Sequence, residues 1–485
     1  MSASSGSGAK PRRVVAVDLG AESCRVSLVN WQPKGATLRT VHRFHNGPKE
    51  RDGHFYWDLS YLREGILEGL RLAAHEASGP IDSLGVDGWG VDYVRLDADL
   101  KPLHDPFCYR DPRTEKVPAQ FWKTFPAERL YAITGIQMLR FNTLYQLIAD
   151  RQAGLPEGAC WLNLPEYILC SLGARPVSEF TLATHTQLLD ASRRAWAPEI
   201  FQSAGLDASK APELVPPGTI VGALKGELAQ REEFWNTKLI APATHDTGSA
   251  VAGIPHSGDD CAFISSGTWS LVGTVLDRPC LSAAAFQQNV SNEGGLEGSS
   301  RFLKNINGMW LIEESVRHWH SQGKEWNVPA LIEACRSLPA PKAFLDVEHS
   351  ELLLSGHMPQ RINSVLKLSG HAPLPEGPEA APQFANLIFH SLAARYTDVL
   401  RMLTEVTGKK FRSVYIVGGG NRNTFLNQLL QERSGLEVIR GPVECSTIGN
   451  AAIQLAALEG RSDSNFGVSR AAVAEWSQRL AALEA

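Results

Sequence analysis

Residues 14–31 read VVAVDLGAESCRVSLVNW and predict two β-strands joined by a small polar turn. The β-branched run at 14–18 is typical of a strand, and residues 25–31 form its partner in a hairpin. Residues 261–276, CAFISSGTWSLVGTVL, repeat this order of strand, turn and strand. The periodicity of the two stretches matches, although few of their residues are identical. We interpret them as a weak internal repeat, which predicts an α/β fold of two related lobes.

The rest of the chain alternates between helical and strand-like patterns. An amphipathic helix opens at Asp58 and runs to about Ala77, and Pro and Gly near 253–260 mark a linker. Further strands are expected at 38–44, 83–87, 91–96, 413–417 and 437–439, and further helices at 382–406, 423–433 and 447–458. The expected division is a disordered tail at 1–13, one domain at 14–253, another at 260–460, and a C-terminal helix or tail at 461–485.

Length and composition restrict the class of protein. The 485 residues exceed one ordinary core and indicate two or three domains. The net charge is −5 with no run of like charges, so nucleic acid is not an expected partner. No apolar run approaches the ~18 residues of a membrane span, and residues 1–10 lack the apolar core of a secretion signal. Eight scattered cysteines without a C-x-x-C pair indicate a reducing, cytoplasmic compartment.

Familiar nucleotide and hydrolase motifs are missing from the sequence, including GxxxxGK[ST], GxGxxG, HExxH and GxSxG. Phosphate binding therefore needs another device. The turn from Asp18 to Arg25 exposes backbone N–H groups, and concave turns of this kind bind anions. Asp18, at the end of its strand, could hold Mg²⁺ through water. Taken alone, the same turn also fits an ordinary hairpin with a capping aspartate.

Three later segments offer related chemistry. Residues 265–268, SSGT, place small residues and hydroxyls in the matching turn of the second lobe. Residues 417–420, VGGG, precede a helix whose N-terminus favours an anion. In residues 244–249, THDTGS, Asp246 is either a helix N-cap or a general base that takes a hydroxyl proton during phosphoryl transfer. A plain turn and a flexible loop remain the alternatives for the first two segments.

A group of aromatic and polar residues suggests a sugar site. Sugars bind against an aromatic face with several fixed polar donors and acceptors. Tryptophan is more often a core residue than a platform, so each of these is also a candidate for the core. The group consists of Trp57, Trp89 and Trp310 with Gly88, Gly90, Asp92, Asn305 and Asn307.

Taken in chain order, these segments resemble the FGGY family of carbohydrate kinases, which belongs to the actin/hexokinase superfamily. Its phosphate and adenosine motifs are matched at 18–21 (DLGA), 265–268 (SSGT), 418–420 (GGG) and 447–450 (TIGN). Longer strings resemble the rhamnulokinase branch: 88–92 (GWGVD), 109–114 (YRDPRT), 141–146 (FNTLYQ), 245–247 (HDT), 292–295 (NEGG) and 303–306 (LKNI). The resemblance spans 14–460 and implies two RNase H-like lobes, a sugar and phosphate side and an ATP side, with an active-site cleft between them.

The resemblance also implies roles for individual residues. Asp246 becomes the proton acceptor. Contacts to the sugar fall on Gly90, His245, Asp246, Thr247 and Asn305. Contacts to ATP fall on Ala21, Glu22, Ser23, Cys24, Arg25, Thr268, Glu313 and Gly419. Two residues depart from the family pattern, because Cys24 stands where the turn usually has glycine and Glu313 where a glutamine touches ATP.

The implied reaction transfers the γ-phosphoryl group of ATP to L-rhamnulose and gives L-rhamnulose 1-phosphate in L-rhamnose catabolism, with Mg²⁺ bridging the phosphates. Another ketose such as L-fuculose or L-xylulose is the nearest alternative, because one methyl group or one epimeric hydroxyl decides the choice. A non-catalytic sugar or nucleotide sensor on the same fold is the second alternative, and the retained Asp246 argues against it. We expect a cytoplasmic enzyme that binds a ketose and ATP, without a nucleic acid or membrane partner, as a monomer or small homo-oligomer.

Overall fold

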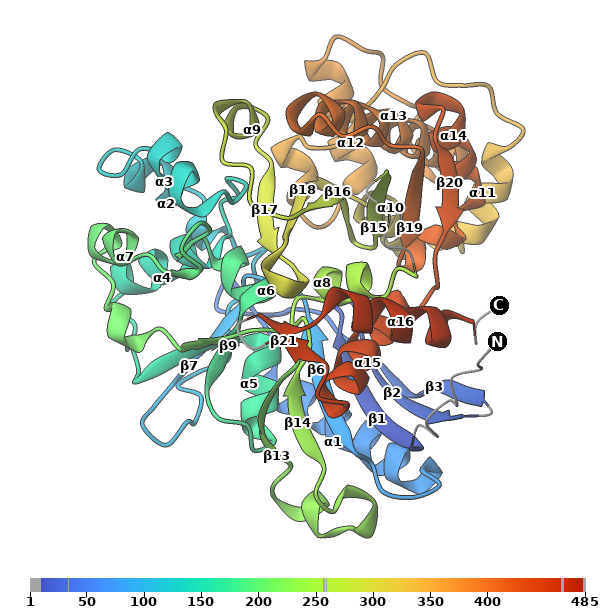
Figure 1. The fold of residues 1–485 in the computed structure, drawn as a ribbon. Coiled ribbons are helices and arrows are strands. Elements are labelled where there is room, and N and C mark those ends of the chain that lie inside the picture. The colour runs from blue at the N-terminus through green and yellow to red at the C-terminus, as the bar shows by residue number, and fades with distance from the viewer. Residues whose placement is uncertain (1–9, 34, 256–257, 259, 464–465, 483–485) are drawn as a thin grey trace.

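The computed structural model describes residues 10–33, 35–255, 258, 260–463 and 466–482, and these form two α/β lobes (Figure 1). Each lobe is built on a six-stranded sheet. The first sheet has the order β13 (Thr219–Ala223), β14 (Lys238–Ala241), β6 (Ser83–Gly88), β1 (Arg12–Leu19), β2 (Ser23–Gln32) and β3 (Gly35–His45). The second has the order β17 (Ser291–Gly294), β18 (Ser300–Asn307), β16 (Trp269–Leu276), β15 (Cys261–Ser266), β19 (Ser413–Val417) and β20 (Glu437–Arg440).

Helices cover these sheets, and short strand pairs extend the first lobe. The helices of the first half are α1 (Leu59–Glu76), α2 (Val117–Phe121), α3 (Ala127–Thr134), α4 (Thr143–Gln152), α5 (Leu164–Ser171), α6 (Phe180–Ala183), α7 (Pro198–Ala204) and α8 (Asp246–Ala252). Those of the second are α9 (Ala283–Gln287), α10 (Trp310–Ser321), α11 (Val328–Cys335), α12 (Met358–Leu368), α13 (Ala381–Thr407), α14 (Thr424–Ser434), α15 (Cys445–Leu458) and α16 (Arg470–Ala481). The small pairs are β4 (Lys49–Arg51) with β5 (His54–Tyr56), β7 (Tyr93–Leu96) with β8 (Cys160–Asn163), β9 (Val177–Glu179) with β12 (Glu213–Val215), β10 (Leu189–Asp190) with β11 (Ala195–Trp196), and β21 (Ser462–Asp463) with β22 (Gly467–Val468).

The two sheets share one topology. β1 pairs antiparallel with β2 and parallel with β6, and β15 pairs antiparallel with β16 and parallel with β19. Outward from these strands, β3 and β18 add antiparallel strands, while β14 and β20 add parallel strands. When β13 and β17, the outermost strand of each sheet on one side, are left out, the chain order third, second, first, fourth, fifth is the same in both lobes. This confirms the expected fold of two RNase H-like lobes and gives the weak sequence repeat a structural meaning.

Several predicted boundaries differ from the structure by a few residues. β1 begins at Arg12, inside the predicted tail, because Asp82 accepts hydrogen bonds of 2.8 Å from both the Arg12 side chain and the Arg13 backbone. Residues 1–9 of that tail lie outside the described residues. The strand expected at 91–96 is shortened to β7, which pairs with β8 away from both main sheets. Burial on all sides made its pattern look like that of a sheet strand.

The two lobes interlock through α8 and α15 (Figure 1). Although α15 lies late in the chain, it packs on β1 and β6 of the first sheet, on α8 and on α16. Its buried amides bind that sheet, with Asn450 Nδ2 donating to Asp87 Oδ2 at 2.6 Å and Gln454 Nε2 donating to the Val15 carbonyl at 3.0 Å. The predicted boundary between the two domains at 253–260 remains a prediction. In space, α15 completes the first lobe.

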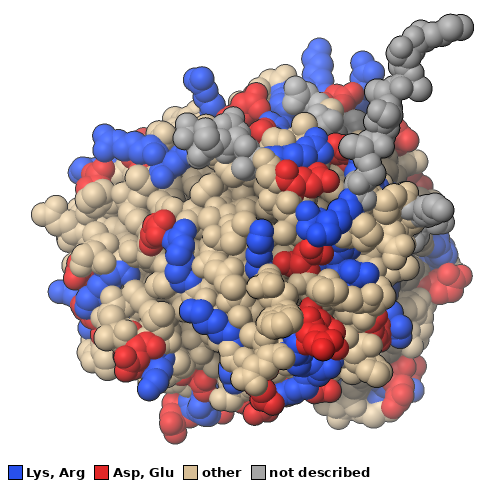
Figure 2. Space-filling model, turned by 60° about the horizontal axis from the view of Figure 1, so that its bottom comes forward, with Lys and Arg blue, Asp and Glu red and all other residues tan. Residues whose placement is uncertain are grey.

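The surface carries charges of both signs without a large field of one sign on the face in Figure 2. Among the described residues, no helix combines the length and apolar character that crossing a bilayer requires. All eight cysteines are free thiols.

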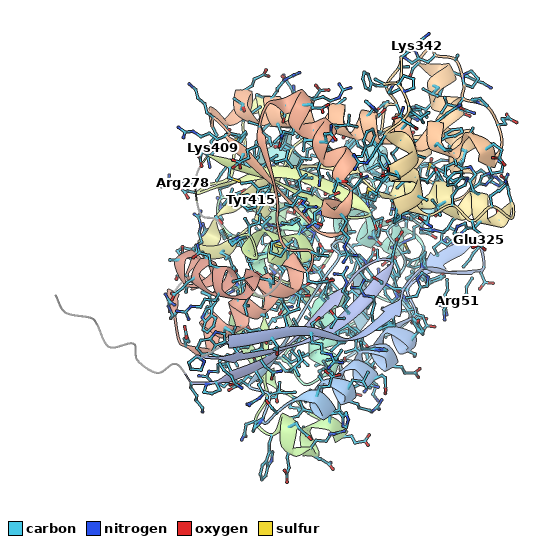
Figure 3. All side chains as sticks on the ribbon, turned by 90° about the vertical axis from the view of Figure 1, so that its right-hand side faces the viewer. Arg51, Arg278, Glu325, Lys342, Lys409 and Tyr415 are labelled. Carbon is cyan, nitrogen blue, oxygen red and sulfur yellow. The ribbon has the colours of Figure 1, made fainter. Side chains whose placement is uncertain are left out.

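In the side view of Figure 3, Glu325 and Lys342 belong to the upper lobe and Arg51 to the lower one.

The crossing of α8 and α15 requires a glycine at position 449, where a Cβ atom would lie 1.8 Å from the Ser249 carbonyl oxygen. We expect Gly449→Ala to push the helices apart and to lower the free energy of unfolding by roughly 1–3 kcal/mol or more. Gly47→Ala is the matched control, since its Cβ meets nothing nearer than 3.6 Å. Urea unfolding of both variants measures the difference, and equal stabilities would contradict this account of the crossing.

Candidate active site

A cleft of about 330 Å³ lies between the lobes, within the size range of small-molecule sites. Its walls come from the β1–β2 turn, the β15–β16 turn, the start of α8, the segment after β19 and the start of α15. The cleft brings together nearly every residue expected from the sequence: Asp18, Ala21, Glu22, Ser23, Arg25, Gly90, His245, Asp246, Thr247, Thr268, Asn305, Glu313 and Gly419. The matching turns of the two lobes thus face one another across one space.

Cys24 is the expected site residue whose side chain does not line the cleft. It is fully buried in the core of the first lobe, with Sγ 3.7 Å from the Gly20 carbonyl oxygen. Burial raises the pKa of this thiol well above its usual range. Cysteine therefore replaces the glycine of the family pattern without its side chain entering the cleft, and a contact to ATP at this position stays a prediction.

The phosphate end of the cleft is acidic. Asp18 accepts a hydrogen bond of 2.7 Å from the Ser446 hydroxyl and lies 3.5 Å from the Arg25 guanidinium. Arg25 also pairs with Glu444 at 2.5 Å, and its pKa is raised by Asp18 first and by Glu444 in addition. Among the described residues that line the cleft, Arg25 is the one Arg or Lys. A triphosphate at this end would therefore rely on backbone N–H groups and on a bound cation.

Glu313 faces Glu22 across the mouth of the cleft, from α10 to the β1–β2 turn. Burial first, and the neighbouring Glu22 carboxylate second, raise the pKa of Glu313 to about 8. Arg317 pairs with Glu22 at 2.9 Å and so joins the two lobes at this point. The raised pKa favours the protonated carboxyl, which resembles the glutamine of the family pattern.

Asp246 is the first residue of α8, and His245 holds the N-cap position. The N-cap alternative for Asp246 is therefore wrong. Its carboxylate is 33% exposed to the cleft and accepts hydrogen bonds from the Thr247 backbone and hydroxyl. Burial raises its pKa, His245 and Thr247 oppose the rise, and Asp18 adds to it. A raised pKa brings a carboxylate closer to the range that suits a general base near neutral pH.

Two buried glutamates that the sequence did not reveal hold the residues before α8. Glu179 accepts a hydrogen bond of 2.8 Å from the Thr244 backbone, and Glu166 accepts one of 2.6 Å from the Glu179 backbone. Burial is the largest influence on both carboxyls and raises the pKa of Glu179 to about 7 and of Glu166 to about 8. Their positions in sequence, far from Asp246, carry no local signal of this support.

The sugar end combines an aromatic wall with fixed polar groups. Gly90 is required there, because a Cβ atom would lie 2.1 Å from His185 Nδ1. Asn305 reaches in from the second lobe, and Gln137 Oε1 accepts hydrogen bonds from its backbone at 2.8 Å and from its side chain at 3.1 Å. The apolar and aromatic lining consists of Trp89, Val91, Tyr109, Leu139, Phe141 and Trp269.

Only one tryptophan of the expected sugar group lies in the cleft. Trp89 lines it, whereas Trp57 is 1% exposed and Trp310 is 5% exposed, and both are core residues. Asp92 is buried behind them and accepts hydrogen bonds from both the Trp57 indole at 2.6 Å and the Trp89 indole at 3.0 Å. Asn307 donates to the Val347 carbonyl outside the cleft. Sequence alone cannot separate these roles, since core and platform tryptophans have the same local pattern.

The sequence reasoning gave no role to several lining residues. Tyr109 and Phe141 stand within strings that resembled the family, which was the available signal. Trp269 and Ser446 directly adjoin the motifs at 265–268 and 447–450, whereas His185 carried no signal, because only folding brings it to the cleft. Tyr109 and Phe141 rings lie 5.4 Å apart, and Phe141 lies 5.6 Å from the Trp269 ring of the second lobe.

Two related lobes around an acidic cleft with a central carboxylate define a class of two-domain kinases, and comparison with known proteins names the family. The model for the N-terminal domain of the FGGY family of carbohydrate kinases matches residues 13–253, and the model for its C-terminal domain matches 262–458. The chain therefore belongs to the FGGY family of carbohydrate kinases.

Individual relatives are more specific than the family models. The chain is 39% identical to a rhamnulokinase of Pectobacterium carotovorum over 458 residues, with 93% of this chain and 89% of the relative covered. It is 38% identical to a rhamnulokinase of Enterococcus faecalis over 453 residues, with 92% and 89% covered.

Solved structures share the fold at low sequence identity. A ligand-bound xylulose kinase from Lactobacillus acidophilus superposes with a TM-score of 0.74 at 14% identity and covers 97% of both chains. Plasmodium falciparum glycerol kinase with ADP superposes with a TM-score of 0.73 at 14% identity and covers 97% of this chain and 93% of that one.

The raised pKa of Glu166 makes stability depend on pH. Between about pH 5 and 8 the folded protein keeps a proton on Glu166 that the unfolded chain has lost, so the free energy of unfolding falls as pH rises. We expect the free energy of unfolding of Glu166→Gln to lack this pH dependence. Between pH 5 and 8 the wild type should lose about 1–4 kcal/mol more of its free energy of unfolding than the variant does. Urea unfolding at pH 5, 6, 7 and 8 measures the loss. Glu405→Gln, at an exposed position, is the control, and its free energy of unfolding should follow that of the wild type. Parallel curves for Glu166→Gln and wild type would contradict the expectation.

Proposed function

We propose that this kinase transfers the γ-phosphoryl group of Mg·ATP to the 1-hydroxyl of L-rhamnulose, giving ADP and L-rhamnulose 1-phosphate in L-rhamnose catabolism. The observation that carries the proposal is the place of Asp246, where the sugar end of the cleft meets the phosphate end. Relatives named rhamnulokinase, at 38% and 39% identity over about nine-tenths of the chain, support the choice of sugar.

The residues of the cleft divide the work in this reaction. Asp246 accepts the proton of the sugar hydroxyl as the phosphoryl group arrives, while His245, Thr247, Gly90 and Asn305 orient the ketose. The turns at 20–23 and 265–268 and the segment at 418–419 supply backbone N–H groups to the phosphates. Closed lobes exclude water, which otherwise competes with the sugar for the phosphoryl group.

Magnesium fits the acidic phosphate end. Asp18 lines the cleft, and Asp87, its neighbour in register on β6, is buried behind it. One or two carboxylates suffice for Mg²⁺, which retains several waters of its own. We propose that Asp18 holds the ion through water. When bound, the cation neutralises negative charge on the phosphates.

The cleft also bears on the choice between ketoses. L-Rhamnulose ends in a methyl group, and the aromatic and aliphatic side chains at the sugar end offer it an apolar surface. L-Fuculose shares that methyl group, so it stays the nearest alternative acceptor. The cytoplasmic location and the monomeric or small homo-oligomeric state remain parts of the proposal.

Removal of the base tests the reaction directly. We expect Asp246→Asn to lower kcat on L-rhamnulose by roughly 10²–10⁴-fold, because the amide cannot accept the proton. ADP release is measured with Mg·ATP and a panel of L-rhamnulose, L-fuculose and L-xylulose, beside Asp99→Asn in an exposed turn as the control. Near-native turnover in Asp246→Asn would refute the base. If the folded wild type releases no ADP with any of these ketoses but binds a sugar tightly, the result would favour a sensor.

Glu313 makes ATP binding sensitive to pH. Its carboxyl is protonated below its pKa of about 8 and ionised above it, where a negative charge would repel the triphosphate. We expect the KM for ATP to rise several-fold between pH 7 and 9 in the wild type and to stay flat in Glu313→Gln. Initial rates at pH 7, 8 and 9 test this, with Glu325→Gln, exposed on the upper lobe (Figure 3), as the control. The same rise in Glu313→Gln would separate Glu313 from ATP binding.

A further inference from the structure

A buried ionic cluster joins the two lobes behind Asp246. His185 and His245 come from the first lobe, with ring centres 4.6 Å apart. Glu293 on β17 and Arg301 on β18 come from the second lobe, and Arg301 Nη1 lies 3.2 Å from Glu293 Oε2. The four side chains are at most 9% exposed. The proposed reaction so far gives Arg301 and Glu293 no part.

The contact between Arg301 and His245 restricts where the imidazole proton sits. Arg301 Nη2 lies 3.1 Å from His245 Nδ1. A guanidinium group has only donors, so Nδ1 must present its lone pair to this contact. In a neutral imidazole the proton is then on Nε2, because the partner of one ring nitrogen decides the state of the other. Burial lowers the pKa of His245 and so favours the neutral ring.

Glu293 is the competing partner, since its Oε2 lies 3.3 Å from the same Nδ1. Acting alone, this carboxylate would favour a proton on Nδ1. That proton would face the Arg301 N–H at 3.1 Å and leave two buried donors opposed. Arg301 also balances the charge of Glu293 through Nη1, and its Nε donates to the Gly294 carbonyl at 2.8 Å, which holds the guanidinium plane in place.

We propose that Arg301 is a positioning residue that holds His245 in the tautomer with its proton on Nε2. His245 Nε2 lies 3.6 Å from Asp246 Oδ1. A donor at this nitrogen stabilises the ionised carboxylate that must accept the sugar proton, and it is also available to an oxygen of the ketose. The other tautomer would turn a lone pair toward the carboxylate. Because the two side chains come from different lobes, the base is supported only while the lobes stand in this arrangement.

Four titratable or charged side chains surround His245. Asp246 follows it in α8, His185 stacks on its ring, and Glu293 and Arg301 face Nδ1. The effect of Arg301 on catalysis rests on the proposed kinase reaction. The tautomer of His245 is independent of that reaction, because it is measured without substrate.

The first test is the state of the ring in the full-length wild type labelled with ¹⁵N-histidine. Long-range ¹H–¹⁵N spectra at pH 7.5 distinguish a proton on Nε2 from one on Nδ1, and the resonances of His245 are assigned by their loss in His245→Gln. We expect a neutral ring protonated on Nε2. A proton on Nδ1, or a fully protonated ring, would overturn the proposal whether or not the enzyme turns over L-rhamnulose.

The second test is kinetic. Lysine at position 301 keeps the charge but lacks the planar fork. We expect Arg301→Lys to lower kcat about 10- to 100-fold, as loss of an outer-shell partner commonly does, with the KM for ATP unchanged within twofold. Arg194→Lys is the control, because Arg194 also crosses the lobes, donating to the Gly298 carbonyl, yet does not touch the histidines. An equal loss in both variants would mean that Arg301 only ties the lobes together.

Two further variants keep the proposal falsifiable if Arg301→Lys folds poorly. Arg301 also lines a second cavity of about 120 Å³, so guanidinium ion at low millimolar concentration should restore part of kcat in Arg301→Ala and none in Asp246→Asn. Glu293→Gln leaves the Arg301 contact in place, and we expect His245 to keep its proton on Nε2. A proton that stays on Nε2 in Arg301→Ala, as in the wild type, would show that Arg301 does not decide the tautomer and would refute the proposal.

Discussion

The close crossing of α8 and α15 is the constraint on which the rest of this structure depends. Gly449 lets α15 approach the Ser249 carbonyl, a distance that no other residue allows. Asp246 opens one of these helices, and Ser446, in the first turn of the other, binds Asp18. A second close approach lies beside it, where a Cβ atom on Gly253 would lie 2.2 Å from the Cys445 carbonyl oxygen. The crossing therefore fixes the proposed base and the proposed cation site relative to each other.

Electrostatics in the cleft follow from burial more than from net charge. Carboxylates outnumber Arg and Lys side chains at the end of the cleft near Asp18, so in the proposed reaction the triphosphate depends on backbone donors, on Mg²⁺ and on the raised pKa of Glu313. Deeper in the protein, burial acts to raise the pKa of Glu293, but the Arg301 guanidinium, 3.2 Å from its Oε2, helps to lower it below its usual range. Among the described residues no cation contacts Glu166 or Glu179, and burial raises the pKa of both. The pKa of the same residue type is thus shifted in opposite directions, according to whether a guanidinium lies beside it.

Much of the fold was predictable because its signals are local. The strand at 413–417 was predicted to the residue, and α13, α14 and α15 within two residues at each end. The strand predicted at 91–96 shows the limit, since its local pattern did not indicate that residues 93–96 pair with β8 outside both main sheets. The start of β1 moved because Asp82, distant in sequence, anchors Arg12 and Arg13.

By itself the sequence determined two repeated hairpins, and it proposed their turns as phosphate sites and Asp246 as the base, because turns, strand periodicity and short motifs depend on neighbours in the chain. Tertiary structure alone decided that Trp57 and Trp310 are core residues, that Cys24 points away from the cleft, and that His185, Glu293 and Arg301 gather behind Asp246. Such choices depend on burial and on partners that approach from the other lobe. A buried charged side chain is stable only where another segment supplies an opposite charge or a hydrogen-bond partner. The local sequence does not indicate which segment that is.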